Sequence, residues 1–521
     1  MSGQSQQHRP AVRIWALCLA GAVAAGLTGC GSDSTSGGGT AGSTSAITRG
    51  SLIHDPPFRI ASLDAATFGA ELGASASGAQ LLQIAGTPTC GVDFYYIEYN
   101  TVGGQGEATT ASGALMVPTG TAAQCSGGRP IVLYAHGTKT DRSTNLADIT
   151  NPDNSEGALI AAMFAAQGYI VVAPNYAGYD ISTLTYHPFL DADQQSKDMI
   201  DALTAARTAL PHSLTTSTTD GGKLFITGYS EGGHVAMATH RAMQALGMTV
   251  TASAPMSGPY ALEAFGDAVF YGQVNIGSTV FTPLLVTSYQ EAYGNIYQHL
   301  TDVYEAKYAP EMADLLPALT PIDTLFQNGI LPQSALFNSQ TPNTGTPLDA
   351  ALAVPANPVF AAGFGPSNLV TNNFRLAYVL DAVANPDGAV PTPTAGVPVA
   401  TNPQNPLRKA FKTNDLRNWV PQRPVLMCGG DADPTVFFSV NTQVMQQYWA
   451  TFPLPAGLIT VVDVNAPVTS ASDPFAAAKV GYQQTIAAIG ASGGASAEVQ
   501  AIHATEAPFC TAVARGFFAQ F

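Results

Sequence analysis

The stretch FITGYSEGGHVAM, residues 225–237, decides the fold, because an apolar run leads directly into glycines that surround one serine. Residues 228–232 (GYSEG) fit the pattern G-x-S-x-G, in which a sharp turn from a strand into a helix lifts the serine above a sheet. Glycine is needed two positions before and after Ser230, because a side chain there would collide with the neighbouring strand and helix. The stretch therefore predicts Ser230 as a nucleophile.

The same pattern occurs a second time, at residues 490–494 (GASGG). That match follows a helix-like stretch and lies among Gly, Ser and Ala, with no apolar run to form a strand before it. In a chain with 51 glycines, a bare match is weak evidence. Since an apolar run precedes Ser230 and a helix-like run at 233–246 follows it, we interpret the first match as functional and the second as coincidental.

A serine becomes an effective nucleophile when a positioned base takes its proton and an acid orients that base. In chains with this turn, the acid and then the histidine follow the serine in the sequence. Of nine histidines, His503 alone lies beyond the last predicted strand, which makes it the expected base. The stretch PVLMCGGDADPTV, residues 424–436, runs from an apolar strand into a glycine turn and offers Asp431 and Asp433 as acids.

Attack on a carbonyl creates an oxyanion that needs hydrogen-bond donors. The stretch YAHGT, residues 134–138, ends a predicted strand in a His-Gly turn, and such a loop supplies one amide while the residue after the nucleophile supplies the other. We therefore predict an oxyanion hole made of the backbone amides of Thr138 and Glu231. His136 is expected to shape this loop, and His187 and His234 are interpreted as packing or surface residues.

Apolar runs alternate with helix-like stretches along the chain, which predicts an α/β fold with a mostly parallel sheet of about eight strands flanked by helices. The predicted strands are 94–99 and 113–117, paired as an opening hairpin, and 130–135, 169–173, 223–227, 249–254, 424–427 and 458–462. The predicted helices between them are 157–167 and 191–210.

Together these features resemble the α/β-hydrolase superfamily and, within it, the secreted lipase and esterase group (secretory lipase-like). The stretches APNYAGY (173–179) and YHPFL (186–190) look like those of bacterial and fungal secretory lipases. The resemblance covers roughly residues 90–260 and 420–521 and implies the α/β-hydrolase fold. Gly430-x-x-Asp433-x-x-Val436 resembles the acid loop of many such hydrolases, which favours Asp433 as the acid, with Asp431 as the alternative.

The resemblance also implies a domain organisation. Residues 51–258 and 424–521 are expected to form the α/β-hydrolase core, and residues 259–423 lie where this superfamily commonly inserts a cap or lid. Such a cap would build the acyl side of the pocket and limit access to Ser230; the alternative is a decorative or docking subdomain without substrate contact. Phe265, Tyr271, Tyr289 and Met312 could line an apolar pocket of this segment, and we favour core packing as the interpretation of each.

The N-terminus is typical of an export signal, because basic residues precede an apolar run at residues 14–27 that is too short to span a membrane. The sequence LTGC, residues 27–30, resembles the bacterial lipoprotein box, which implies removal of residues 1–29 and lipidation of Cys30; an ordinary signal peptide is the alternative. Residues 30–50 are expected to be a flexible tether rich in Gly, Ser and Thr. We therefore expect export, as an outer-membrane lipoprotein or an extracellular protein.

Two of the six cysteines lie in the export signal and at the lipidation site, which leaves an even number in an oxidising compartment. Four cysteines form two disulfides in one of three connectivities. We favour Cys90 with Cys125 and Cys428 with Cys510, because each pair would bracket one local unit. No CxxC motif or histidine cluster indicates a metal site, and we expect no cofactor.

The composition excludes some partners. The net charge of −16 and the lack of any cluster of Lys and Arg argue against nucleic acid. The membrane is an expected partner through the lipid anchor. The expected substrate is a small-molecule or lipid ester.

The sequence as a whole predicts a secreted or surface-anchored serine carboxylic ester hydrolase (lipase or esterase) that uses no metal. Ser230 would attack, His503 would shuttle the proton, Asp433 would orient the base, and water would clear the acyl-enzyme. One alternative is a serine exopeptidase of the same fold, for which acidic residues of the inserted segment would clamp an amine. The acids that leave this open are Glu263, Asp267, Glu291, Asp302, Glu305, Glu311 and Asp314. Another is an inactive hydrolase-fold binding lipoprotein, against which the complete set of Ser, His and Asp argues.

Overall fold

The computed structural model describes residues 48–151, 154–210 and 217–521, which belong to one compact unit. The expected signal peptide at residues 1–29, the lipidation site Cys30 and all of the predicted tether before residue 48 lie outside the described residues.

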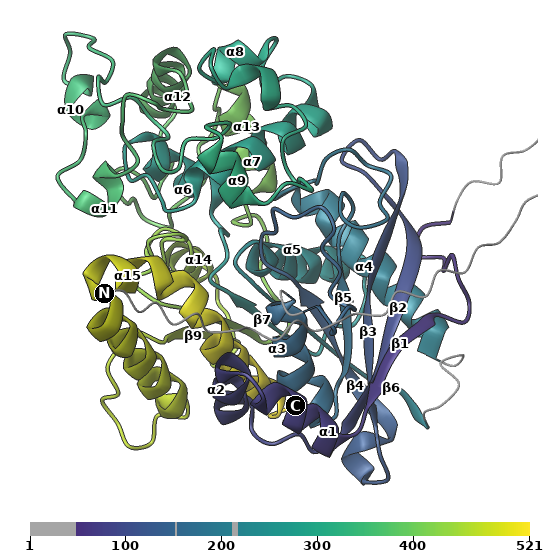
Figure 1. The fold of residues 1–521 in the computed structure, drawn as a ribbon. Coiled ribbons are helices and arrows are strands. Elements are labelled where there is room, and N and C mark those ends of the chain that lie inside the picture. The colour runs from purple at the N-terminus through teal and green to yellow at the C-terminus, as the bar shows by residue number, and fades with distance from the viewer. Residues whose placement is uncertain (1–47, 152–153, 211–216) are drawn as a thin grey trace, which may run out of the picture. The chain divides into compact units, whose positions relative to one another are not determined.

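One sheet runs through the described residues, with nine strands in the order β1-β2-β3-β5-β4-β6-β7-β8-β9 (Figure 1). The strands β1 to β3 run antiparallel to their neighbours, and every pair from β5 to β9 is parallel. The mostly parallel α/β sheet predicted from the sequence is therefore confirmed. The strands are β1 (Phe58–Leu63), β2 (Gly91–Val102), β3 (Ala108–Thr119), β4 (Gly127–Ala135), β5 (Ile170–Pro174), β6 (Thr218–Tyr229), β7 (Ala252–Met256), β8 (Val425–Gly429) and β9 (Ile459–Asp463).

The edge strand β1 was not predicted. Its sequence FRIASL is mostly exposed and pairs with β2 on one side, so it lacks the continuous apolar run that marked the buried strands. β6 also begins earlier than predicted, because the polar residues 218–220 pair with the start of β4 before a shift in register. Both β1 and the start of β6 join the sheet through hydrogen bonds to a neighbouring strand, and a local sequence pattern does not reveal such pairing.

Helices cover both faces of the sheet (Figure 1). Side chains alternate along β4, so that Ile131 and Leu133 join the core beside α4 and α5, while Val132 and Tyr134 join the core beside α3 and α15. The helices of these layers are α1 (Ala65–Gly73), α2 (Ala76–Ala85), α3 (Ser155–Met163), α4 (Ala192–Ala209), α5 (Glu231–Ala245), α14 (Thr442–Trp449) and α15 (Ala476–Phe518).

The segment between β7 and β8 is helical and gathers on one side of the sheet, drawn in green at the top of Figure 1. It has a core of its own, built from residues such as Tyr289, Phe337 and Tyr378. Its helices are α6 (Leu262–Phe270), α7 (Ser278–Tyr293), α8 (Leu300–Val303), α9 (Ile322–Gln327), α10 (Leu348–Leu352), α11 (Pro358–Ala361), α12 (Asn372–Ala384) and α13 (Pro406–Asn414). The division into core and cap stays a prediction.

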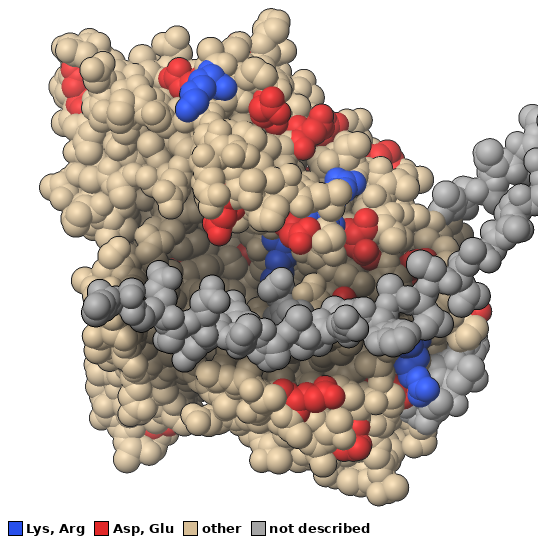
Figure 2. All heavy atoms as spheres, viewed as in Figure 1, with Lys and Arg blue, Asp and Glu red and all other residues tan. Residues whose placement is uncertain are grey.

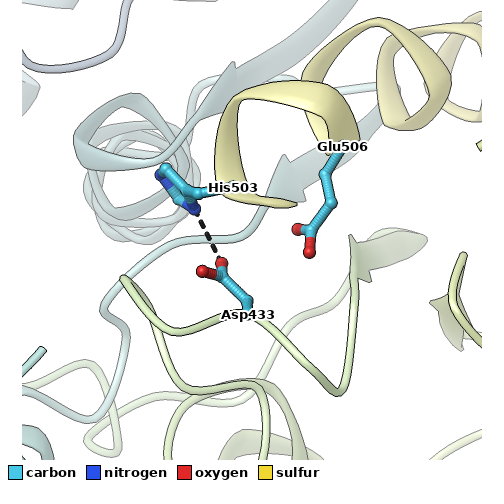
Figure 3. Close-up of side chains that lie close together, drawn as sticks. All are labelled: Asp433, His503 and Glu506. Atoms are coloured by element: carbon cyan, nitrogen blue, oxygen red, sulfur yellow. Dashed lines mark hydrogen bonds and ion pairs between the residues drawn. The ribbon is translucent and has the colours of Figure 1, made fainter. Parts of the chain in front are cut away.

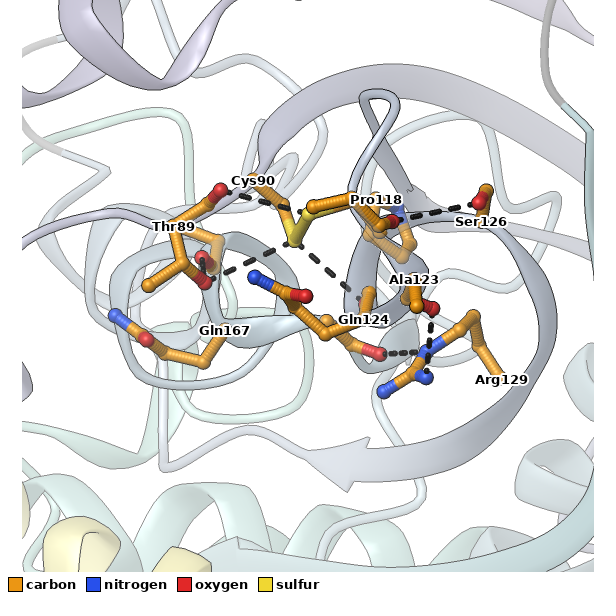
Figure 4. Close-up of a disulfide and its surroundings, with 12 residues drawn as sticks. Thr89, Cys90, Pro118, Ala123, Gln124, Ser126, Arg129 and Gln167 are labelled. Carbon is orange, nitrogen blue, oxygen red and sulfur yellow. Dashed lines mark hydrogen bonds between the residues drawn. A yellow bond between two sulfur atoms is a disulfide. The ribbon is translucent and has the colours of Figure 1, made fainter.

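Two disulfides pair the cysteines as the sequence analysis favoured. Cys90 bonds Cys125 beside the start of β4, where Arg129 Nε donates to the carbonyl of Gly168 at 2.7 Å (Figure 4). Cys428 in β8 bonds Cys510 in α15, which joins the two elements across 82 residues. Within the described ranges, no helix is both long enough and apolar enough to cross a bilayer.

Candidate active site

The turn after β6 holds Ser230 in a strained backbone conformation. Ser230 has a φ of 60°, and the helix α5 begins at the next residue. A Cβ atom at Gly228 would lie 2.4 Å from the carbonyl oxygen of Gly232, and one at Gly232 would lie 2.0 Å from that of Ala135. Glycine is therefore required at both positions, because the strand and the helix approach too closely for any side chain.

Ser230, His503 and Asp433 form a continuous hydrogen-bonded chain. His503 Nε2 lies 2.8 Å from Ser230 Oγ, and His503 Nδ1 lies 2.7 Å from Asp433 Oδ2. The other carboxylate oxygen of Asp433 accepts hydrogen bonds from the amides of Thr435 and Val436. With Nδ1–H directed at Asp433, Nε2 is oriented to take a proton from the serine.

The alternative acid, Asp431, lies elsewhere. Its carboxylate accepts a hydrogen bond from Asn465 Nδ2 at 2.6 Å and is exposed, whereas Asp433 is buried. The structure therefore brings Asp433, and not Asp431, to the histidine.

Thr138 and Glu231, whose amides are the predicted oxyanion donors, both line the cavity at Ser230. In the described part of the chain, neither the N–H of Thr138 nor that of Glu231 donates to another residue. The amide of Gly137, by contrast, donates to Glu156 at 3.0 Å and is not available. His136 contacts the carbonyl oxygens of Gly137 and Asn175 through its ring, which fits its expected part in shaping the loop.

A carboxylate that the sequence analysis did not single out holds the loop that carries Thr138. Glu156, in α3, accepts hydrogen bonds from Tyr134 and from the amide of Gly137, and it forms an ion pair with Lys139 at 2.7 Å. Burial by itself raises the pKa of Glu156, but the charge of Lys139 and the hydrogen bonds from Lys139 and the amide of Gly137 lower it to about 2. No local pattern marks Glu156, because its partners come from another element.

A second carboxylate, that of Glu231, is buried behind the nucleophile. His187 Nε2 and Gln195 Nε2 each lie 2.7 Å from Glu231 Oε1, and His187 Nδ1 lies 2.9 Å from the carbonyl oxygen of Ala177. Burial raises the pKa of Glu231, but the neighbouring His187 lowers it below its ordinary value overall. His187 is therefore more than a packing residue, since it holds the side chain of Glu231, a residue that lines the cavity.

A third carboxyl group, Glu506, lies close to the acid and the base. It extends from α15, the helix that carries His503, toward the loop of Asp433 (Figure 3). Donor atoms of Asp433, His503 and Glu506 all lie within 4.8 Å of one another, a spacing compatible with a metal ion. His503 already forms hydrogen bonds with both Asp433 and Ser230, an arrangement suited to proton transfer. The expectation of no metal and no cofactor stays a prediction.

An apolar cavity opens at Ser230 and extends into the inserted helices. Its volume is about 100 Å³. Side chains from α6, α7, α12 and α13 line it, including Phe265, Phe281, Leu285, Phe374 and Phe411. Phe265 therefore lines the cavity and is not a core residue alone, whereas Tyr289 and Met312 are buried in the helical core as expected.

A second, more polar cleft reaches Ser230 and His503 from another side. Lys139, Asn151 and Glu156 are among its lining residues. On the face shown in Figure 2, acidic side chains are scattered and the few basic ones that are visible do not gather into a patch. The expected absence of a nucleic-acid partner stays a prediction.

Comparison with known proteins finds one family model and several similar structures. A model of the prolyl oligopeptidase family matches residues 157–273, the part of the chain that contains the turn at Ser230. No curated protein matches the chain.

Two kinds of solved structure are similar over almost the whole chain. The ligand-bound esterase LipA from Xanthomonas oryzae, described as degrading the rice cell wall, is 26% identical, and the match covers 90% of this chain and 98% of LipA with a TM-score of 0.63. A putative hydrolase from Legionella pneumophila is 18% identical and covers 90% of this chain and 97% of its own, with a TM-score of 0.61. The second match concerns the fold alone.

Proposed function

This chain belongs to the α/β-hydrolase superfamily, and we propose that within it the chain is a serine carboxylic ester hydrolase of the lipase and esterase kind. Its membership and the site at Ser230 make it a serine hydrolase. The observation that carries the finer proposal is the apolar cavity that ends at the serine, because such a cavity accepts an acyl chain.

The mechanism follows from the contacts. Ser230 Oγ attacks the ester carbonyl while His503 Nε2 takes its proton, and Asp433 holds the ring in the required tautomer. The amides of Thr138 and Glu231 donate to the oxyanion. His503 then gives the proton to the leaving alcohol, and water attacks the acyl-enzyme by the same route.

The main alternative is the exopeptidase, which needs free acidic groups to bind an amine. Glu263 and Asp267, the two acids on α6, are buried and lie 3.5 Å and 2.9 Å from Arg408 Nη2. Both are therefore engaged within the inserted segment, which disfavours a clamp made of them. The similarity to LipA supports the esterase, and the prolyl oligopeptidase family model keeps the peptidase as the second candidate.

The test compares esters with amides. Residues 31–521 are expected to hydrolyse p-nitrophenyl esters, and Ser230→Ala is expected to abolish turnover. Aminoacyl p-nitroanilides serve as the peptidase substrates. If the protein hydrolyses the anilides and barely hydrolyses the esters, the peptidase becomes the supported function. If it hydrolyses neither, a binding protein is favoured.

We also propose that the protein is exported and anchored by a lipid on Cys30. The two disulfides support export, because such bonds persist in oxidising compartments. Radioactive palmitate should label the full chain in a bacterial host and should not label Cys30→Ala. Equal labelling of both proteins would contradict the anchor.

A further inference from the structure

Glu506 is a buried carboxyl group that the proposed mechanism does not use. It is fully buried, and its Oε2 lies 2.6 Å from Ser257 Oγ and 3.5 Å from Tyr229 Oη. Its other oxygen, Oε1, lies beside the main chain of Gly430 without a hydrogen bond of good geometry. A Cβ atom at Gly430 would lie 2.4 Å from that oxygen, so the carboxyl group rests directly on the main chain of the loop that leads to Asp433.

The surroundings of Glu506 contain no compensating cation. Within the described ranges, no Lys or Arg forms an ion pair with it. The titratable groups that face it are Asp433 on the acid loop, His503 and Tyr482 on α15, Tyr229 at the end of β6 and Asp463 at the end of β9. An ionised carboxylate here would be buried next to the negative charge of Asp433, an arrangement that is costly unless one of the two groups is neutral.

We propose that Glu506 is a positioning residue whose uncharged carboxyl group joins the helix of His503 to the Ser257 turn and the Asp433 loop. This inference rests on the proposed serine hydrolase function. Tyr229 contributes to the same junction, because its hydroxyl donates to the main-chain oxygen of His503. Asp433 then remains the sole negative charge in contact with the base.

The charge state has a physical consequence for the base. Burial and then the charge of Asp433 raise the pKa of Glu506 well above its ordinary value, in agreement with a neutral group. A second negative charge beside the imidazole would favour its protonated form, which cannot accept the proton of Ser230. A neutral carboxyl group holds the geometry without this effect.

The experiment measures the rate at which a fluorophosphonate reacts with Ser230, because this reaction needs the triad and is independent of the substrate class. Glu506→Gln keeps the shape and hydrogen bonding of an uncharged carboxyl group, and Glu506→Leu removes the polar contacts. Glu498→Gln, on the same helix, is the control. Rates are measured from about pH 5 to pH 9, together with melting temperatures.

Glu506→Gln is expected to react within about threefold of the wild-type rate, and its midpoint, the pH at which its rate falls to half on the acid side, should be that of the wild type. Glu506→Leu is expected to react at least about tenfold more slowly. A tenfold loss or a shifted midpoint in Glu506→Gln would show that the wild-type group is ionised and would overturn the proposal. A wild-type rate in Glu506→Leu would overturn it as well. If Glu506→Leu does not fold, the midpoint of Glu506→Gln decides alone. No reaction of the wild type would overturn the hydrolase function itself, and with it this inference.

Discussion

The loop after β8 carries two aspartates, Asp431 and Asp433, in different surroundings. Asp433 lies against His503, and Asp431 lies against Asn465 at the surface. Asp433→Asn is expected to lower kcat by about 10³ to 10⁴, because an amide favours the wrong tautomer of the base. Asp431→Asn, the matched control, should stay near the wild-type rate in the same ester assay. A large loss of kcat in Asp431→Asn with little loss in Asp433→Asn would show that Asp431 is the acid.

A buried histidine far from the chemistry should govern part of the stability in acid. His240 on α5 lies 2.8 Å from Ser253 Oγ, its other ring nitrogen has no partner, and burial lowers its pKa from 6.5 to about 4. The unfolded chain therefore binds the proton first, so the stability contributed by neutral His240 is present above pH 6.5 and is lost as the pH falls toward 4.

The measurement is urea unfolding of the wild type and His240→Gln at pH 7.5 and pH 5. Between these values the wild type should lose about 2 kcal/mol relative to the variant, whatever the absolute difference at pH 7.5. Other titrating groups cancel in this comparison. A constant difference between the two proteins would refute the prediction.

At the scale of elements, the Cys428–Cys510 disulfide joins the strand before the acid loop to the helix of the base. Cys510 lies two helical turns beyond His503 on the same face of α15. Replacing both cysteines by alanine should cost about 4 kcal/mol of stability and should also lower kcat by about tenfold at a temperature where the variant is folded.

The second disulfide provides the control for this prediction. Cys90 and Cys125 close a shorter loop at the opposite end of the sheet, in contact with neither Asp433 nor His503. Their double alanine variant should lose comparable stability and keep kcat. Thermal unfolding and ester turnover distinguish the two pairs; an equal kcat in both variants would show that the Cys428–Cys510 bond has no effect on the site.

The second G-x-S-x-G match shows how a local pattern depends on the element that carries it. The second G-x-S-x-G match lies inside α15, where Gly494 has a φ of 81° and marks a kink between two helical halves. The pattern therefore marks no nucleophile there, because no strand precedes it to make the strained turn. The same helix, α15, fills most of the interval between the end of β9 at Asp463 and His503.

At the scale of the molecule, the inserted helices and the sheet together make the cavity. Leu285 on α7 lines it, and a larger side chain there should shorten the acyl chain that fits. Leu285→Trp is expected to lower kcat/KM for a long-chain p-nitrophenyl ester at least about tenfold more than for the acetate. Leu319→Trp, at a position of the same segment that is 76% exposed, is the control and should not change the ratio. An unchanged ratio in Leu285→Trp would place the acyl chain outside this cavity.

The sequence by itself determined the parallel sheet, the turn at Ser230 and the histidine that the structure brings to it, and it favoured Asp433 over Asp431 as the acid. These depend on local patterns: apolar runs, glycines beside the serine, and the order of the residues along the chain. The tertiary structure alone decided between Asp433 and Asp431, added the edge strand β1, and placed Glu156, His187 and Glu506 around the site. Those three residues act through contacts between elements distant in sequence, and a buried charge or a buried neutral carboxyl group is defined by such contacts and not by its neighbours along the chain.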